Sequence, residues 1–210
     1  MIALDRVAIA GLCIVLAAWF AFVVVMVRRS KPPADPATEA QRDRRSLIGI
    51  ALQAAAYAVA WWRPTFAFEK LLLASQSRPW NPLSAVWLAI IAALMVAGVL
   101  LARTAIYTLG KQWTLVAQVG ERHTLVTHGP YAKVRNPIYT AMLLLLIGTG
   151  LALNTPMRLV VALLLFTAGT AVRVHYEERL LRARHGAEFD AYRRRVPAVL
   201  PRWVFPSRPF

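Results

Sequence analysis

Two adjacent glutamates at the end of an apolar segment are the side chains best suited to chemistry. Glu177 and Glu178 follow the apolar run 159–174, and Arg173 lies four residues before Glu177, where it would face that carboxylate on a helix. Charge is costly near hydrocarbon, so ionisable groups here indicate a functional site. The pattern is typical either of a helix-end ion pair or of a site for a cationic or amino-bearing ligand, in which the arginine orients a carboxylate or pairs with an anion.

A second polar group stands directly before another apolar run, 138–153. Gly129-Pro130 predicts a turn. Arg135 and Asn136 then precede Pro137, and proline is favoured in the first turn of a helix. Because free backbone N–H groups at a helix start favour anions, this spacing predicts a site for a carboxylate. The alternative is a basic cluster that merely ends a membrane span on its cytoplasmic side.

The histidines and the cysteine do not indicate a metal site or a disulfide. His123, His128, His175 and His185 match no common zinc spacing. Cys13 is the single cysteine, so no intramolecular disulfide can form. We therefore predict no metal.

The elements that hold these groups are long apolar segments. The 210 residues are 58% hydrophobic, and the apolar residues form runs near the roughly 20 residues that cross a bilayer. This predicts an all-α, polytopic integral membrane protein with about five transmembrane helices, at residues 7–27, 47–62, 86–102, 138–153 and 159–174. The last two form a short helical hairpin, for which a re-entrant pair or an extra crossing is the alternative.

The distribution of basic residues predicts the orientation. Net charge is +15, and we attribute it to cytoplasmic flanks of spans and to anionic lipid headgroups, not to nucleic-acid binding. The basic linker 28–45, the loop 103–136 and the tail should share the cytoplasmic face. Two regions follow: residues 1–102 with three spans, and residues 103–210, which contain both groups of candidate catalytic side chains.

Two amphipathic segments complete the expected fold. Residues 65–83 mix aromatic, aliphatic and charged side chains, which predicts a helix lying on the membrane surface. The tail, residues 175–196, should form a cytoplasmic helix whose apolar side chains share one face. That face consists of Leu181, His185, Phe189, Tyr192 and Val196.

The order of these motifs resembles the isoprenylcysteine carboxyl methyltransferase family, and related phospholipid methyltransferases share parts of it. The likeness covers about residues 109–201. Its motifs are Leu109-Gly110-x-x-Trp113, His123-x-Leu-Val-Thr-x-Gly-Pro-Tyr131, Val-Arg-Asn-Pro-x-Tyr139, Arg173-x-x-x-Glu-Glu178 and His-Gly-x-x-Phe-x-x-Tyr192-x-x-x-Val-Pro197. The resemblance implies an all-helical membrane enzyme that uses S-adenosylmethionine in a pocket facing the cytoplasm.

The resemblance also implies roles for individual residues. The catalytic group is Arg173, Glu177 and Glu178. The cofactor-binding group is His123, Gly129, Tyr131, Arg135, Asn136, Pro137, Tyr139, Glu178 and Tyr192. Asn136 departs from the family, which usually has histidine there. Asparagine forms hydrogen bonds but does not change charge near neutral pH, which places any proton-handling role of this position in doubt.

The predicted function is methyl transfer to a lipidic or prenylated substrate. Carboxyl O-methylation is the favoured reaction. A carboxylate acceptor is already ionised and needs a cation to hold it, for which we propose Arg173. Tyr131 and Tyr139 could attract the sulfonium of the cofactor. The alternatives are phospholipid amine N-methylation, a sterol-type NADPH-dependent membrane reductase, and a non-enzymatic scaffold or transporter component. We expect a bacterial inner-membrane location.

Overall fold

The computed structural model describes residues 6–29, 46–62, 80–110, 124–153 and 156–201. Within these residues the chain is helical and contains no strand, which confirms the predicted all-α class. The elements are α1 (Arg6–Arg29), α2 (Ser46–Trp61), α4 (Pro82–Leu109), the short 3-10 helix η3 (Gly129–Ala132), α5 (Pro137–Leu153) and α6 (Pro156–Arg195).

Three of these helices, α1, α4 and α6, are long and apolar enough to cross a membrane. The apolar helices α2 and α5 have 16 and 17 residues, slightly fewer than a full crossing usually needs. The structure therefore supports a polytopic membrane protein, while the count of five crossings stays a prediction. The predicted surface helix 65–83 lies largely outside the described residues.

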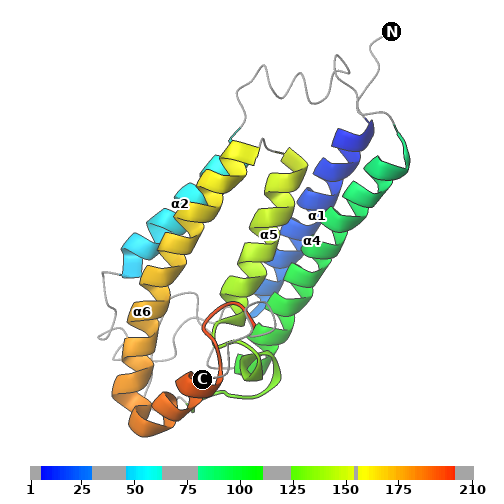
Figure 1. The fold of residues 1–210 in the computed structure, drawn as a ribbon. Coiled ribbons are helices and arrows are strands. Elements are labelled where there is room, and N and C mark those ends of the chain that lie inside the picture. The colour runs from blue at the N-terminus through cyan, green and yellow to red at the C-terminus, as the bar shows by residue number, and fades with distance from the viewer. Residues whose placement is uncertain (1–5, 30–45, 63–79, 111–123, 154–155, 202–210) are drawn as a thin grey trace, which may run out of the picture.

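Helix α5 lies between two groups of helices (Figure 1). On one side it packs against α1 and α4 around Val15, Met95 and Leu145. On the other side it packs against α2 and α6 around Leu146 and Phe166. The adjacent residues Leu145 and Leu146 thus belong to different cores. Large apolar side chains on the outer surface, such as Phe20 and Leu164, stay exposed, as expected for helices that face lipid.

Helices α2 and α6 run antiparallel and approach closely. Near one end, Arg158 Nη1 of α6 donates to the Trp62 carbonyl at 3.2 Å. Near the other, Gly49 and Gly169 meet: a Cβ on Gly169 would lie 2.7 Å from the Gly49 carbonyl oxygen. Small residues at such a crossing allow backbones to approach, as is usual between membrane helices.

Polar side chains bond across these helix contacts. Gln53 Nε2 donates to Thr170 Oγ1 at 2.9 Å between α2 and α6. Trp19 Nε1 donates to Thr149 Oγ1 at 3.0 Å between α1 and α5. Interhelical hydrogen bonds of this kind fix the packing of membrane helices.

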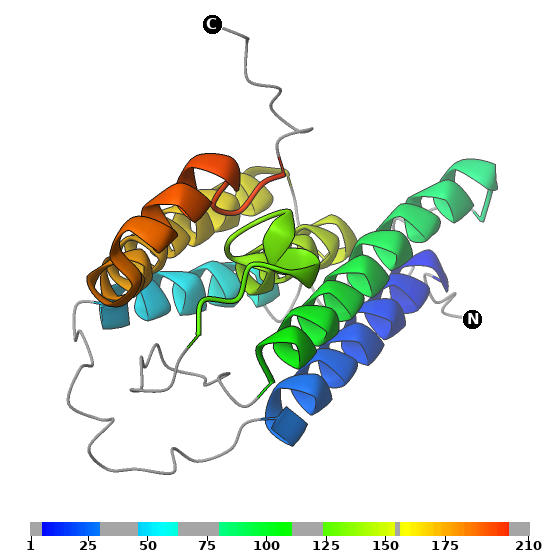
Figure 2. The ribbon, with the colours of Figure 1, turned by 90° about the horizontal axis from the view of Figure 1, so that it is seen from below.

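The helix directions bring several chain ends together. The end of α1, the start of α2, the end of α4, the start of α5 and the tail lie at one end of the molecule, which Figure 2 views from below. This agrees with the prediction that the linker 28–45, the loop 103–136 and the tail lie on the same side of the membrane. The groups that could do chemistry therefore meet at this end.

Two boundaries differ from the prediction. Helix α4 continues through Arg103 to Leu109, because the sequence remains helix-compatible until Gly110, whose φ is +58°. The tail, predicted as one helix over residues 175–196, is divided at Gly186, where φ is +49°: residues 175–185 continue the helix that begins at Pro156, and a second helical segment follows the kink and ends at Arg195. Glycine adopts this left-handed φ without the steric penalty of a side chain. The predicted apolar face of the tail is buried at Phe189, Tyr192 and Val196.

Candidate functional site

Glu178 is the centre of a buried charge cluster. Arg135 Nη2 lies 2.7 Å from Glu178 Oε1, and both side chains are only about a tenth exposed, at 10% and 12%. Arg135 Nε donates to the same oxygen at 2.8 Å. Arg193 Nε approaches the other oxygen, Oε2, at 3.4 Å. Two residues predicted to belong to the site thus form a close ion pair.

Arg135 also holds the end of α6. Its Nη1 donates to the carbonyl of Arg193 at 3.1 Å and to the carbonyl of Val196. Carbonyl groups at a helix end lack intrahelical partners, and a guanidinium has several donors in a planar fork. One side chain therefore connects the loop before α5, the carboxylate of α6 and the tail.

Glu177 belongs to a second cluster. Tyr139 OH donates to Glu177 Oε1 at 2.5 Å, and Arg173 Nη2 donates to the same oxygen at 3.0 Å. The Arg173 guanidinium also lies over the Tyr139 ring, 5.1 Å from its centroid. Arg173 Nε is buried and has no hydrogen-bond partner among the described residues. The two adjacent glutamates thus serve separate clusters.

The loop before α5 is fixed by a turn and a buried tyrosine pair. Gly129 has a φ of +60° and begins η3, where its backbone passes close to Thr108 of α4. Tyr131 is buried, and Tyr192 OH donates to its carbonyl at 2.6 Å. Burial raises the pKa of Tyr131 far above its ordinary value, so its phenol stays neutral. This contact docks the tail on the loop.

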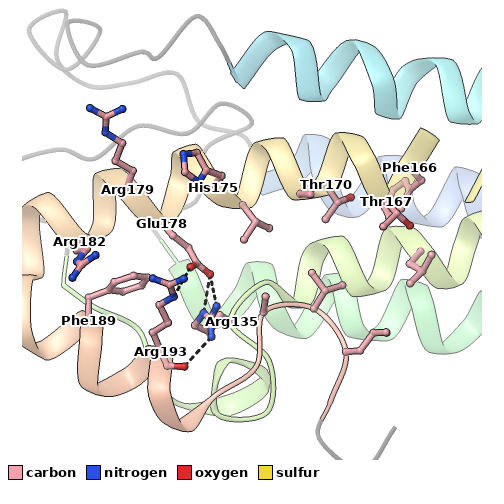
Figure 3. Close-up of a pocket in the computed structure, with 16 residues that line it drawn as sticks. Arg135, Phe166, Thr167, Thr170, His175, Glu178, Arg179, Arg182, Phe189 and Arg193 are labelled. Atoms are coloured by element: carbon pink, nitrogen blue, oxygen red, sulfur yellow. Dashed lines mark hydrogen bonds and ion pairs between the residues drawn. The ribbon is translucent and has the colours of Figure 1, made fainter. Parts of the chain in front are cut away.

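A cavity of about 660 Å³ lies beside the first cluster. Figure 3 shows Glu178 pointing toward Arg135 and Arg193, with Phe166 and Thr167 further along α6. The remaining wall comes from Leu143 of α5 and from residues 198–200 of the tail. The cavity therefore has a charged end and an apolar end. Its volume is in the range that binds small molecules and cofactors, about 300–1,000 Å³.

The predicted site residues do not all line the cavity. Arg135 and Glu178 line the cavity, whereas Arg173, Glu177 and Tyr139 form the neighbouring cluster and do not line it. Pro137 is buried at the first position of α5. His123 lies outside the described residues. The catalytic and cofactor-binding roles of all these residues stay predictions.

At the start of α5, carbonyl groups of the tail occupy backbone N–H groups that were expected to bind an anion. The N–H of Arg135 donates to the Pro197 carbonyl at 2.8 Å, and the N–H of Asn136 donates to the Ala198 carbonyl at 2.9 Å. The reason is that the tail returns to this point and its carbonyl groups take the free donors. These two N–H groups are therefore not available to a ligand carboxylate in this arrangement.

Sequence reasoning missed several cavity residues on α6. They are Thr167, Thr170, Ala171, His175, Arg179 and Arg182. Most of them share a helical face with Glu178, whereas Arg179 directly follows it. Helical periodicity extended in both directions from Glu178 could have found most of them. Arg182 is also held in place, because it pairs with Asp190 at 3.1 Å across the break at Gly186.

The described residues contain no group of three or more His, Cys, Asp or Glu side chains arranged to hold a metal ion. The cavity instead offers guanidinium groups, one carboxylate and apolar walls. This donor set suits an organic ligand that carries charge at one end.

Comparison with known proteins identifies relatives of this chain. Residues 86–188 match the phospholipid methyltransferase family. A probable protein-S-isoprenylcysteine O-methyltransferase of Oryza sativa subsp. indica is 31% identical over 110 residues, 51% of this chain and 58% of the rice protein. The nickel-cobalt-cadmium resistance protein NccN of Alcaligenes xylosoxydans xylosoxydans is 30% identical over 142 residues, 67% of this chain and 63% of NccN.

A solved structure shares the fold. The eukaryotic intramembrane Ras methyltransferase ICMT (isoprenylcysteine carboxyl methyltransferase) superposes with a TM-score of 0.54 over 89% of this chain and 62% of that chain, at 20% identity. The chain thus spans less than two thirds of the length of each of these three relatives. The resemblance predicted from the motifs is confirmed at the level of the family.

Proposed function

We propose that the chain transfers a methyl group from S-adenosylmethionine to a lipidic substrate. The proposal is supported by the match of residues 86–188 to the phospholipid methyltransferase family and by the likeness to isoprenylcysteine O-methyltransferases. The observation that carries the proposal is the cavity between α5 and α6, charged at Glu178 and apolar at Phe166. A charged methyl donor and an apolar acceptor require two such ends in one site.

The residues present fit the donor. S-adenosylmethionine supplies a methyl group on a positively charged sulfur and also carries a carboxylate, an amine and hydroxyl groups. The Glu178 carboxylate can accept hydrogen bonds from an amine or a hydroxyl, and the cavity arginines can hold a carboxylate. The protein would contribute mainly alignment of donor and acceptor and exclusion of water.

The charge of the cavity favours a carboxylate acceptor. Its described lining contains four arginines, Arg135, Arg179, Arg182 and Arg193, and one acidic side chain, Glu178. After Arg135 and Arg193 pair with Glu178 and Arg182 pairs with Asp190, a net positive charge remains, which attracts an ionised carboxylate. Such an acceptor needs no general base, whereas a protonated amine must first lose its proton. We therefore propose carboxyl O-methylation of a prenyl-type or other lipidic acid, with the cavity arginines as the cations that hold the acceptor carboxylate. Arg173, predicted for this role from the sequence, does not line the cavity.

The apolar part of the acceptor would lie between the helices. Thr167 and Ala171 line the cavity and are exposed on α6, so the cavity is open on the side that would face lipid. Leu143 and Phe166 provide the apolar wall. An acyl or prenyl chain could reach the charged end from the bilayer through this opening.

The acceptor class is tested by methyl transfer from labelled S-adenosylmethionine to S-farnesylated cysteine or to phosphatidylethanolamine, with enzyme in lipid nanodiscs. We expect label in the farnesylcysteine product, released as methanol by mild base because the product is an ester. Base-stable label in phosphatidylethanolamine would instead establish amine N-methylation. Reduction of a sterol by NADPH, without methyl transfer, would overturn the proposed function.

A further inference from the structure

Four successive carbonyl groups of the tail are bound by one short stretch of chain. The Val196 carbonyl accepts from the Arg135 side chain, and the Pro197 carbonyl from the Arg135 N–H at 2.8 Å. The Ala198 carbonyl accepts from the N–H of Asn136 at 2.9 Å and from its Nδ2 at 3.1 Å. The Val199 carbonyl accepts from Thr140 Oγ1 at 2.6 Å. We call residues 135–140 with 196–199 the tail clasp.

The tail clasp forms part of the cavity. Ala198, Val199 and Leu200 line it opposite the α6 face that carries Phe166 and Glu178. Figure 3 shows the tail running past Arg135 on this side. The position of this wall therefore depends on hydrogen bonds from the start of α5, because residues 197–200 are not helical and lack the internal bonds of a helix.

We propose that Asn136 and Thr140 are positioning residues: they fix residues 196–200 as a wall of the cavity and so set how tightly the acceptor binds. The effect on acceptor binding rests on the proposed function. The docking of the tail on α5 does not, because it is a property of the folded protein. Thr140 is nearly fully buried, with 8% exposed, and its hydroxyl donates directly to the wall.

The same geometry assigns a role to Asn136, where the family usually has histidine. Its Nδ2 is a donor to the tail, so the position acts through a hydrogen bond and not through a change of charge. An imidazole N–H can donate in the same way. Asn136→His should therefore keep the clasp, whereas the isosteric Asn136→Asp replaces the donor with an acceptor that faces a carbonyl oxygen.

The test compares Thr140→Val, which keeps the shape but removes the hydroxyl, with Thr140→Ser, which keeps the hydroxyl. We expect Thr140→Val and Asn136→Asp to raise KM for the farnesylcysteine acceptor about three- to tenfold, the effect of losing about one hydrogen bond, with kcat changed less than about twofold. Thr140→Ser should stay near the wild-type KM.

Thr149→Val is the matched control on the same helix. It removes a buried hydroxyl that bonds to Trp19, far from the clasp, so it should lower thermal stability without raising KM. Equal KM values for Thr140→Val and wild type, or an equal rise in Thr149→Val, would overturn the positioning role.

A second readout does not depend on activity. Amide hydrogen exchange of Arg135 and Asn136 reports the bonds to Pro197 and Ala198. Faster exchange in Thr140→Val than in Thr149→Val would support the clasp. This result would hold even if the wild-type protein transferred no methyl group, because the absence of methyl transfer would refute only the proposed function. Unchanged exchange in Thr140→Val would overturn the proposal itself.

Discussion

Glu178→Gln is expected to lower kcat/KM for methyl transfer at least about a hundredfold while the protein still inserts and folds. Glutamine preserves the shape and one acceptor oxygen but removes the charge that pairs with Arg135 and Arg193. A hundredfold loss in kcat/KM corresponds to about 2.8 kcal/mol of transition-state stabilisation, which is within the roughly 2–5 kcal/mol lost when one partner of a buried, hydrogen-bonded charge pair in a binding site is removed. The measurement is steady-state kinetics in nanodiscs together with thermal unfolding.

Glu188→Gln is the matched control for this prediction. Glu188 is an exposed glutamate just beyond the kink at Gly186 and does not line the cavity, so its variant should keep wild-type kinetics. Wild-type turnover in Glu178→Gln would remove Glu178 from the site. A comparable loss in both variants would point to a general effect of charge on the enzyme.

Arg173 and Glu177 together permit a sharper experiment than either residue alone. Arg173→Met leaves the Glu177 carboxylate without its cation beside Tyr139. We expect a loss of about 3 kcal/mol in unfolding free energy, or a fall in Tm of about 10 °C for a chain of this size. The double variant Arg173→Met with Glu177→Gln removes both charges and should recover most of this stability.

The activity of the double variant then separates two roles. If Arg173 holds the acceptor carboxylate, as the sequence predicted, the double variant should be at least about a hundredfold less active than wild type even though its stability is recovered. Arg158→Met, at the opposite end of α6, should leave both stability and activity nearly unchanged. A stable and active double variant would contradict the role of Arg173 and make its cluster purely structural.

Hydropathy and motif order predicted the helices and much of the site because they depend on local sequence. Within the described residues, runs of apolar residues located α1, α2, α4, α5 and α6, with most boundaries correct to within a few residues. The family resemblance of the motifs placed Arg135 and Glu178 in one site, and the structure brings the two side chains within 2.7 Å of each other.

What the sequence could not show depends on contacts between distant segments. Nothing local indicates that the tail carbonyls of Pro197 and Ala198 occupy the start of α5. Nor does the sequence show that adjacent glutamates serve different clusters, since successive residues on a helix point in directions about 100° apart. Both features required the tertiary packing of α5 between α2, α4 and α6.

Calorimetric titration of the purified protein with S-adenosylmethionine and its demethylated product, with NADPH as the control, tests the central claim most directly. We predict saturable binding of one equivalent of each sulfur compound and no heat with NADPH. Weaker binding in Glu178→Gln but not in Glu188→Gln would connect the ligand to the cavity. Binding of NADPH alone, or of none of the three compounds, would contradict the assignment as a methyltransferase.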